Sequence, residues 1–210
     1  MNLTKLFETQ KALDERIVKE KGREGQDLFP EKILALLTEL GELSNEWRGF
    51  KFWSEDREPR TERKVGCHVC RGEGYFMMSV DNDDEENCEY CAGTGLQEDS
   101  NPLLEEYVDC LHFILSIGLE SRFEHLDFEA ARNEYLSHRI DFKEVSITRQ
   151  FNNVFHFIVK FEEESLSDEF VSVVLSFIVL GEALGFTWNQ IETAYYEKNA
   201  INHSRQESNY

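Results

Sequence analysis

The chain of 210 residues is 40% hydrophobic, which is enough to bury one sizeable core, or a core with a small satellite module. Lys and Arg total 22 against 42 Asp and Glu, and the formal net charge of -20 repels a polyphosphate backbone. These numbers exclude nucleic acid as the main partner. They do not exclude a small nucleotide that arrives with a metal cation.

No stretch approaches the roughly 18 uncharged apolar residues that a membrane span needs. The first ten residues, MNLTKLFETQ, lack the basic and then apolar pattern of a signal peptide. We therefore expect a soluble protein of the cytoplasm without a membrane partner. In that compartment, two Cys-x-x-Cys pairs among the five cysteines indicate metal ligands rather than disulfides.

A first helix is predicted over residues 3–21, because apolar residues recur at helical spacing and Gly22 follows as a terminator. Gln10 lies on the apolar stripe of this helix, where a buried amide needs hydrogen-bond partners. Hydrogen bonds to the backbone are the ordinary explanation for such a glutamine, and contact with a ligand is the alternative.

The second predicted helix has Pro30 in its first turn and runs to about residue 48, with six apolar side chains on an arc of roughly 120 degrees. Glu39, Glu42 and Glu46 form a second arc directly beside the first. This helix therefore places three carboxylates along the border of the surface that it is expected to bury.

The third predicted helix opens at Asn101 and Pro102 and continues as LLEEYVDCLHFILSIGL. On its helical wheel Glu106 falls within the apolar face and Asp109 lies next to it, whereas Glu105 points away. Two acids of this helix are thus directed toward the core.

Four further helices are predicted, over residues 127–137, 147–162, 167–184 and about 187–204. Residues 147–159 are rich in β-branched and aromatic residues and could form a strand by composition, but no alternating partner strand occurs elsewhere. We therefore expect an all-α helical bundle, with residues 1–210 forming a single domain.

Four acids on the second and third helices form a predicted metal site: Glu39, Glu42, Glu106 and Asp109. Like charges at a core border repel one another, and burying an unpaired carboxylate is unfavourable. No lysine or arginine shares these helix faces. Two such helices packed antiparallel would form an oxygen cage suited to Mg²⁺, although single E-x-x-E pairs also occur on many solvated helices.

Three blocks of the chain resemble, in the same order, the all-α nucleoside triphosphate pyrophosphohydrolases, and within this MazG-like superfamily the dimeric dUTPases. They are ELGELSNEWRGFKFW at 39–53, LLEEYVDCLHF at 103–113 and KNAINHSRQ at 198–206. The resemblance implies a helical bundle of this type, a homodimer, and hydrolysis of dUTP to dUMP and pyrophosphate. Such an activity cleans the nucleotide pool and supplies dUMP.

The resemblance also implies two magnesium ions that bridge the phosphates while water attacks the α-phosphorus. By position, Glu39, Glu42, Glu106 and Asp109 would hold the metal, and Glu42 would orient or deprotonate the attacking water. Paired metal ions lower the pKa of bound water and neutralise charge on the leaving group. Glu46 matches no residue with such a role in the family, and we expect it to lie behind these ligands.

Further residues match the places where the family binds its substrate. Gln10 falls where the family has a glutamine near the uracil, and Asp14, one turn later, is a weaker candidate. Lys51 matches the lysine of an aromatic-lysine-aromatic stretch and would contact phosphate. Trp53 would either line the nucleoside-binding site or make only ordinary packing contacts within the protein.

The C-terminal block supplies Lys198, Asn202 and Arg205, at spacings of four and three on one side of a helix. Two cations and an amide suit a polyphosphate tail. Beyond this block the family commonly has Gly-Tyr, whereas this chain has Asn209 before Tyr210. Asparagine tolerates left-handed backbone better than other non-glycine residues, so we expect the turn to survive.

An insertion, which we place at residues 60–98, contains two repeats of Cys-x-x-Cys-x-Gly-x-Gly, at 67–74 and 88–95. Two such cysteine pairs are a strong signal for structural zinc, and the repeats resemble the cysteine-rich modules of DnaJ-type chaperones. The expected zinc ligands, without His68, are Cys67, Cys70, Cys88 and Cys91.

A closed four-cysteine site leaves no open position for catalysis, so we expect it to fold the insertion or to dock a protein partner. A redox Cys-x-x-Cys is the alternative, but the βαβ context of such motifs is missing. Outside the insertion, Cys110 is expected to be a small hydrophobe and His112 a surface or satisfied side chain.

Two alternatives to a dUTPase stay open on the sequence alone. One is a MazG-like hydrolase of another nucleoside triphosphate, because Gln10 and the aromatic residues identify the base only by analogy. The other is a non-catalytic helical module that recruits a protein partner through the zinc knuckle.

Overall fold

The structure is a computed structural model that describes residues 3–77, 85–137 and 146–207 of the chain. Asn209, where the sequence departs from the family pattern, lies outside the described residues. Its effect on the C-terminal turn stays a prediction.

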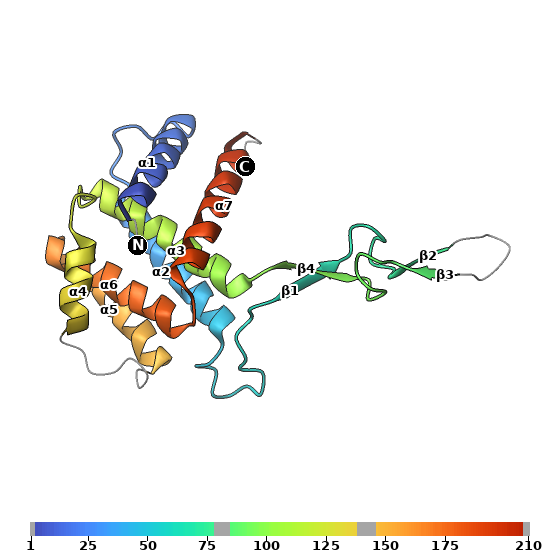
Figure 1. Cartoon of the computed structure of the whole chain (residues 1–210). Coiled ribbons are helices and arrows are strands. Elements are labelled where there is room, and N and C mark those ends of the chain that lie inside the picture. Colours follow the sequence, from blue (N-terminus) through green and yellow to red (C-terminus); the bar gives the residue numbers. More distant parts are fainter. Residues whose placement is uncertain (1–2, 78–84, 138–145, 208–210) are drawn as a thin grey trace.

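The described residues contain seven helices that pack into one bundle (Figure 1). Their bounds are α1 Leu3–Glu20, α2 Phe29–Trp47, α3 Pro102–Glu120, α4 Phe128–Ser137, α5 Ile147–Glu164, α6 Ser167–Ala183 and α7 Trp188–Glu207. The predicted all-α bundle is confirmed, and the segment that could have been a strand by composition is the first part of α5. No single described helix is long and apolar enough to cross a bilayer, and α6 with α7 meets the criteria only as a pair bent by 109°.

The two acidic helices begin and end at local signals in the sequence. Asn101 caps α3, because its side chain accepts a hydrogen bond from the Leu104 N–H at 3.0 Å, and Pro102 takes the first helical position. Helix α2 has Pro30 in its first turn and is capped at its C-terminus by Arg48, whose φ of 63° is left-handed. These signals set where the two helices begin and end, whereas the spacing of their apolar residues sets which face is buried.

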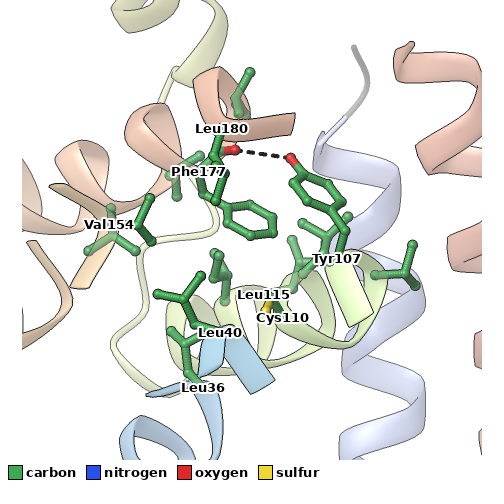
Figure 2. Close-up of a cluster of buried hydrophobic side chains, with 14 of the residues drawn as sticks. Leu36, Leu40, Tyr107, Cys110, Leu115, Val154, Phe177 and Leu180 are labelled. Carbon is green, nitrogen blue, oxygen red and sulfur yellow. Dashed lines mark hydrogen bonds between the residues drawn. The ribbon is translucent and has the colours of Figure 1, made fainter. Parts of the chain in front are cut away.

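The core lies where α2, α3, α5 and α6 meet. Figure 2 shows part of it, including Leu36, Leu40, Tyr107, Cys110, Leu115, Val154, Phe177 and Leu180. The Tyr107 ring stacks on Phe177 with centroids 4.2 Å apart, and its hydroxyl donates to the Phe177 carbonyl oxygen at 3.1 Å. The buried hydroxyl is thus satisfied and ties α3 to α6.

Between α2 and α3 the chain forms an arm that projects away from the bundle (Figure 1). In it, β1 Arg63–Gly66 pairs antiparallel with β4 Leu96–Ser100, and β2 Tyr75–Met77 pairs antiparallel with β3 Glu85–Asn87. The sequence did not predict these strands. They are three to five residues long and cover no apolar core, so they carry no alternating hydrophobic pattern.

Gly118 of α3 provides a test of how closely the helices pack. A Cβ added there would lie 2.7 Å from Phe170 Cζ and 2.8 Å from Phe7 Cε1. Gly118→Ala should therefore lower the free energy of unfolding by about 1–3 kcal/mol through overpacking, measured by urea denaturation.

Gly41 of α2 is the matched control, because no atom lies within 4 Å of a Cβ added there. Gly41→Ala should raise the free energy of unfolding by about 0.5–1 kcal/mol, since alanine favours the helix. Equal effects of the two substitutions would contradict the close approach of α1 and α6 at Gly118.

Candidate functional site

Three carboxylates from two helices converge where α2 packs on α3. Glu39 and Glu42 come from α2 and Glu106 from α3, and one carboxylate oxygen of each lies within 4.8 Å of the others. The i, i+3 spacing puts both glutamates of α2 on one face. Glu39 and Glu106 are half-buried and Glu42 is exposed, so this acid cluster lies at the edge of the core.

Burial and like charge raise the pKa of two members of the acid cluster. Burial raises the pKa of Glu106 to about 7, and the charges of Asp109, Glu39 and Glu42 add to this shift. The pKa of Glu39 is raised by burial first and then by Asp109 and Glu42. A cation among these oxygens would stabilise the ionised carboxylates and so oppose the rise in their pKa. Carboxylate oxygens are hard ligands of the kind that Mg²⁺ prefers.

Asp109, the fourth predicted ligand, is bonded to a lysine from a third helix. Lys198 Nζ of α7 donates to Asp109 Oδ2 at 2.5 Å, and each side chain is 19% exposed. Burial raises the pKa of Asp109, and the bond to Lys198 opposes that shift. Helix α7 therefore supplies a cation that the faces of α2 and α3 do not contain.

A cavity of about 240 Å³ lies beside the acids and is walled by four helices. Its lining residues are Gln10, Leu13, Asp14 and Ile17 of α1, Glu39 of α2, Asp109, His112, Phe113 and Ser116 of α3, and Lys198, Asn202 and Arg205 of α7. The cavity thus brings together predicted residues from both ends of the sequence.

A network of side-chain hydrogen bonds holds Gln10 at the cavity wall. Its Oε1 accepts from the Tyr195 hydroxyl at 2.9 Å and lies 2.7 Å from His112 Nδ1, while its Nε2 donates to Asp14 Oδ1 at 2.7 Å. Ser116 donates to the other oxygen of Asp14 at 2.6 Å. The partners of Gln10 are side chains rather than the backbone, and they fix which way its amide points.

His112 has a place in this network that the sequence did not predict. The residue is 6% exposed, and its ring stacks on Tyr195 with centroids 4.4 Å apart. Burial lowers its pKa to about 3, so the ring is neutral at pH 7. With Nδ1 donating to Gln10, Nε2 keeps a lone pair, and this atom is buried without a hydrogen-bond partner among the described residues.

Two predicted substrate contacts, Lys51 and Trp53, lie on the loop after α2 and are not among the described residues that line the cavity. Lys51 Nζ lies 5.7 Å from the centroid of the Phe50 ring. Trp53 is 65% exposed, with its ring edge-on to Phe50 and Phe52. Glu46, expected behind the metal ligands, has one carboxylate oxygen buried without a hydrogen bond in the described structure.

A second candidate metal centre lies in the arm, where the four cysteines of the two repeats are buried together. The Sγ atoms of Cys67 and Cys88 are 4.0 Å apart, and those of Cys70 and Cys91 are 3.8 Å apart. Four sulfurs at about 2.3 Å from one tetrahedral ion would lie about 3.8 Å from one another. The spacing fits zinc, and the four cysteines are free of disulfides.

The two cysteine repeats close around each other by exchanging backbone hydrogen bonds. The backbone N–H of the first cysteine in each repeat donates to the carbonyl oxygen of the last glycine in the other repeat. These bonds run from Cys67 to Gly95 at 2.7 Å and from Cys88 to Gly74 at 2.8 Å. Each of these glycines has a positive φ and donates its own N–H to the second cysteine sulfur of its repeat, at 3.1 and 3.3 Å. These bonds fix the positions of the two sulfur atoms within the cluster.

The raised pKa of Glu106 predicts how the stability of magnesium-free protein depends on pH. The carboxyl group loses its proton near pH 4.5 when unfolded and near pH 7 when folded. The free energy of unfolding should therefore fall as the pH rises from about 4.5 to about 7. Glu106→Gln should remove part of this fall, measured by urea denaturation at several pH values.

Glu105 is the matched control for this experiment, because its side chain is 39% exposed on the same helix and pairs with Arg63. Glu105→Gln should leave the pH dependence unchanged. An unchanged dependence in Glu106→Gln would contradict the crowding of the acid cluster.

The family of the chain is identified by comparison with known proteins. A family model described as dUTPase matches residues 2–88 and 92–210. Comparison with curated proteins gives no match. Because the matched residues include both acidic helices, the glutamine of α1 and the cations of α7, the chain belongs to the all-α dUTPase family.

Proposed function

We propose that this protein hydrolyses dUTP to dUMP and pyrophosphate with magnesium held at the acid cluster. The observation that carries the proposal is the convergence of Glu39, Glu42 and Glu106 beside a cavity that α7 lines with cations. The family match supports nucleotide hydrolysis at the level of the family. The homodimer expected from the resemblance, and the cytoplasmic location, stay predictions.

The donor set of the acid cluster fits magnesium. Glu39, Glu42 and Glu106 would hold the metal, and Asp109 would join them once Lys198 moves away from its carboxylate. When bound, magnesium would lower the pKa of a coordinated water and offset negative charge on the phosphate oxygens. Glu42 is the exposed member, where a carboxylate can hydrogen-bond an attacking water and accept its proton.

The α7 side of the cavity supports binding of a polyphosphate. Lys198, Asn202 and Arg205 all line the cavity, and Arg205 Nη1 lies 3.4 Å from Asn202 Oδ1. A guanidinium group binds phosphate oxygens in pairs, while an ammonium group acts as a compact charge. In a chain with a net charge of -20, these groups provide local positive charge next to the acids.

The α1 side of the cavity supports recognition of the base. Gln10 presents an oriented amide, and neutral His112 has an unused acceptor at Nε2. Uracil carries an N–H between two carbonyl groups, where cytosine carries an acceptor. A site built from matched donors and acceptors can reject the wrong base strongly, because a mismatch leaves buried polar groups unpaired. This argument favours uracil over cytosine, whereas thymine carries the same hydrogen-bonding edge as uracil and differs from it by one methyl group.

We also propose that Cys67, Cys70, Cys88 and Cys91 hold one zinc ion with a structural role. The four cysteines are the buried cluster of the arm, so the ion would take the place of a hydrophobic core. All four tetrahedral positions would be filled by sulfur, which leaves none for a substrate.

Pyrophosphate release from a panel of nucleoside triphosphates, with and without Mg²⁺, tests the proposed reaction. We expect Mg²⁺-dependent release from dUTP in preference to dCTP, dTTP, dATP and dGTP. Glu39→Gln should lower kcat by at least about 100-fold, because even residues that only support a metal ligand commonly contribute 10- to 100-fold. Glu105→Gln on α3 should keep its activity, since its carboxylate pairs with Arg63 instead.

Release from a different base would favour a hydrolase of another nucleoside triphosphate. No release from any nucleotide would favour a non-catalytic binding module. Full activity of Glu39→Gln would show that the acid cluster is not the catalytic site.

Lys198→Met should separate metal binding from substrate binding. The Lys198 ammonium group is bonded to the Asp109 carboxylate and competes with a metal ion for it. Removing the ammonium group should therefore raise the affinity for Mg²⁺ in the absence of nucleotide, measured by titration calorimetry. The KM for dUTP should rise by about 10-fold through loss of a charged contact to phosphate. Lys160→Met, which breaks the ion pair with Glu169, is the control and should change neither quantity. Weaker binding of Mg²⁺ to Lys198→Met would contradict the competition for Asp109.

A further inference from the structure

The arm exposes large apolar side chains that its own fold does not bury. Val69, Phe76 and Tyr90 are 43%, 41% and 61% exposed. Exposed apolar residues scattered singly are normal, whereas contiguous ones mark surfaces that bind a partner. These three line one hollow of about 690 Å³, so they form a contiguous patch.

A second hollow, of about 470 Å³, adjoins the first, because Val69 and Phe76 line both. We call the two hollows together the arm groove. It lies in the part of the molecule that projects from the bundle (Figure 1), away from the helices that carry the acid cluster.

The rim of the arm groove is acidic. Glu86 and Glu89 line the first hollow, and Glu73 lines the second together with Arg71. Phe76 and Glu86 are directly paired across β2 and β3, so they lie on the same face of this ribbon. Apolar and acidic side chains therefore alternate over a short distance.

The backbone beside the arm groove also favours an extended partner. Strands β2 and β3 form a two-stranded sheet, in which each strand has one edge without a strand partner in the described structure. An extended peptide can add to such an edge, with alternate side chains entering the pockets beside it.

We propose that the arm groove docks an extended segment of a partner protein in which apolar side chains alternate with lysine or arginine. The apolar side chains would cover Val69, Phe76 and Tyr90, and the cations would pair with Glu73, Glu86 and Glu89. A second copy of this chain is a poor occupant because it brings the same negative charge, and nucleic acid is repelled. This binding goes beyond the proposed hydrolysis and does not depend on it.

Fluorescence anisotropy with labelled peptides of about ten residues tests the proposal on the zinc-loaded full chain. The first peptide alternates lysine with valine and phenylalanine. The second replaces lysine by glutamate, and the third replaces the apolar residues by serine. The first should bind at least about 10-fold more tightly than either of the others.

Variants of the full chain then locate the binding surface. Phe76→Ser should weaken binding of the first peptide by about 10-fold, and so should the double variant Glu86→Lys with Glu89→Lys. Leu166→Ser is the matched control, because Leu166 is 55% exposed on the bundle, and this variant should bind normally. Zinc content of one ion per chain and an unchanged circular dichroism spectrum verify that each variant is folded.

Equal binding of the serine peptide, or normal binding by folded Phe76→Ser, would reduce the interaction to general attraction between opposite charges and overturn the proposal. Absence of binding by the first peptide would also overturn it. Self-association of the full chain that Phe76→Ser abolishes would identify a second copy as the occupant and overturn it as well.

Discussion

The packing of α2 on α3 forces like charges together at the rim of a hydrophobic core, and the rest of the site depends on this contact. Each fully buried leucine contributes about 1.5–3 kcal/mol to folding. A pair of carboxylates about 4 Å apart costs about 1 to 4 kcal/mol, depending on how much water screens it. Leu36, Leu40 and Leu43 of α2 pack in the same core as the apolar face of α3, so packing outweighs the repulsion and the acids stay clustered.

The bond between Lys198 and Asp109 shows how the protein limits this repulsion without a metal. The lysine comes from α7, and its charge lowers the pKa of Asp109, Glu39 and Glu106 against the effect of burial. One ammonium group stabilises the ionised form of several carboxylates, because water screens its charge only partly at this half-buried site. Helix α7 is thereby attached to α3 at the same place where a substrate with its own cation would compete.

The sequence predicted the features that depend on local spacing. Helical periodicity was sufficient to place Glu39, Glu42 and Glu106 at the border of the core, since the period of an α-helix is fixed by its backbone. The two cysteine pairs predicted a four-sulfur cluster for a similar reason, because a short knuckle brings its own cysteines together.

Features that arise from contacts between distant segments were not predicted. The wheel of α3 directs Asp109 inward and could have shown that His112, three residues later, shares its side of the helix. It could not show that Tyr195 of α7 stacks on the histidine or that Lys198 reaches Asp109, because nothing in the spacing of α3 specifies which helix packs against it. The short strands of the arm escaped prediction because hydrogen bonds rather than buried side chains hold them together.

The root of the arm has a mechanical consequence. The Arg60 N–H donates to the carbonyl oxygen of Glu46 at the end of α2, and the Arg60 carbonyl oxygen accepts from the Leu103 N–H at the start of α3, each at 3.0 Å. The chain thus leaves and re-enters the bundle at one place. Because the entropic cost of closing a loop grows only slowly with its length, the long excursion adds little to that cost. Because the arm is joined to the bundle at this place, a force applied to the arm would act first on α2 and α3. The relative position of these two helices sets the spacing of the carboxylates.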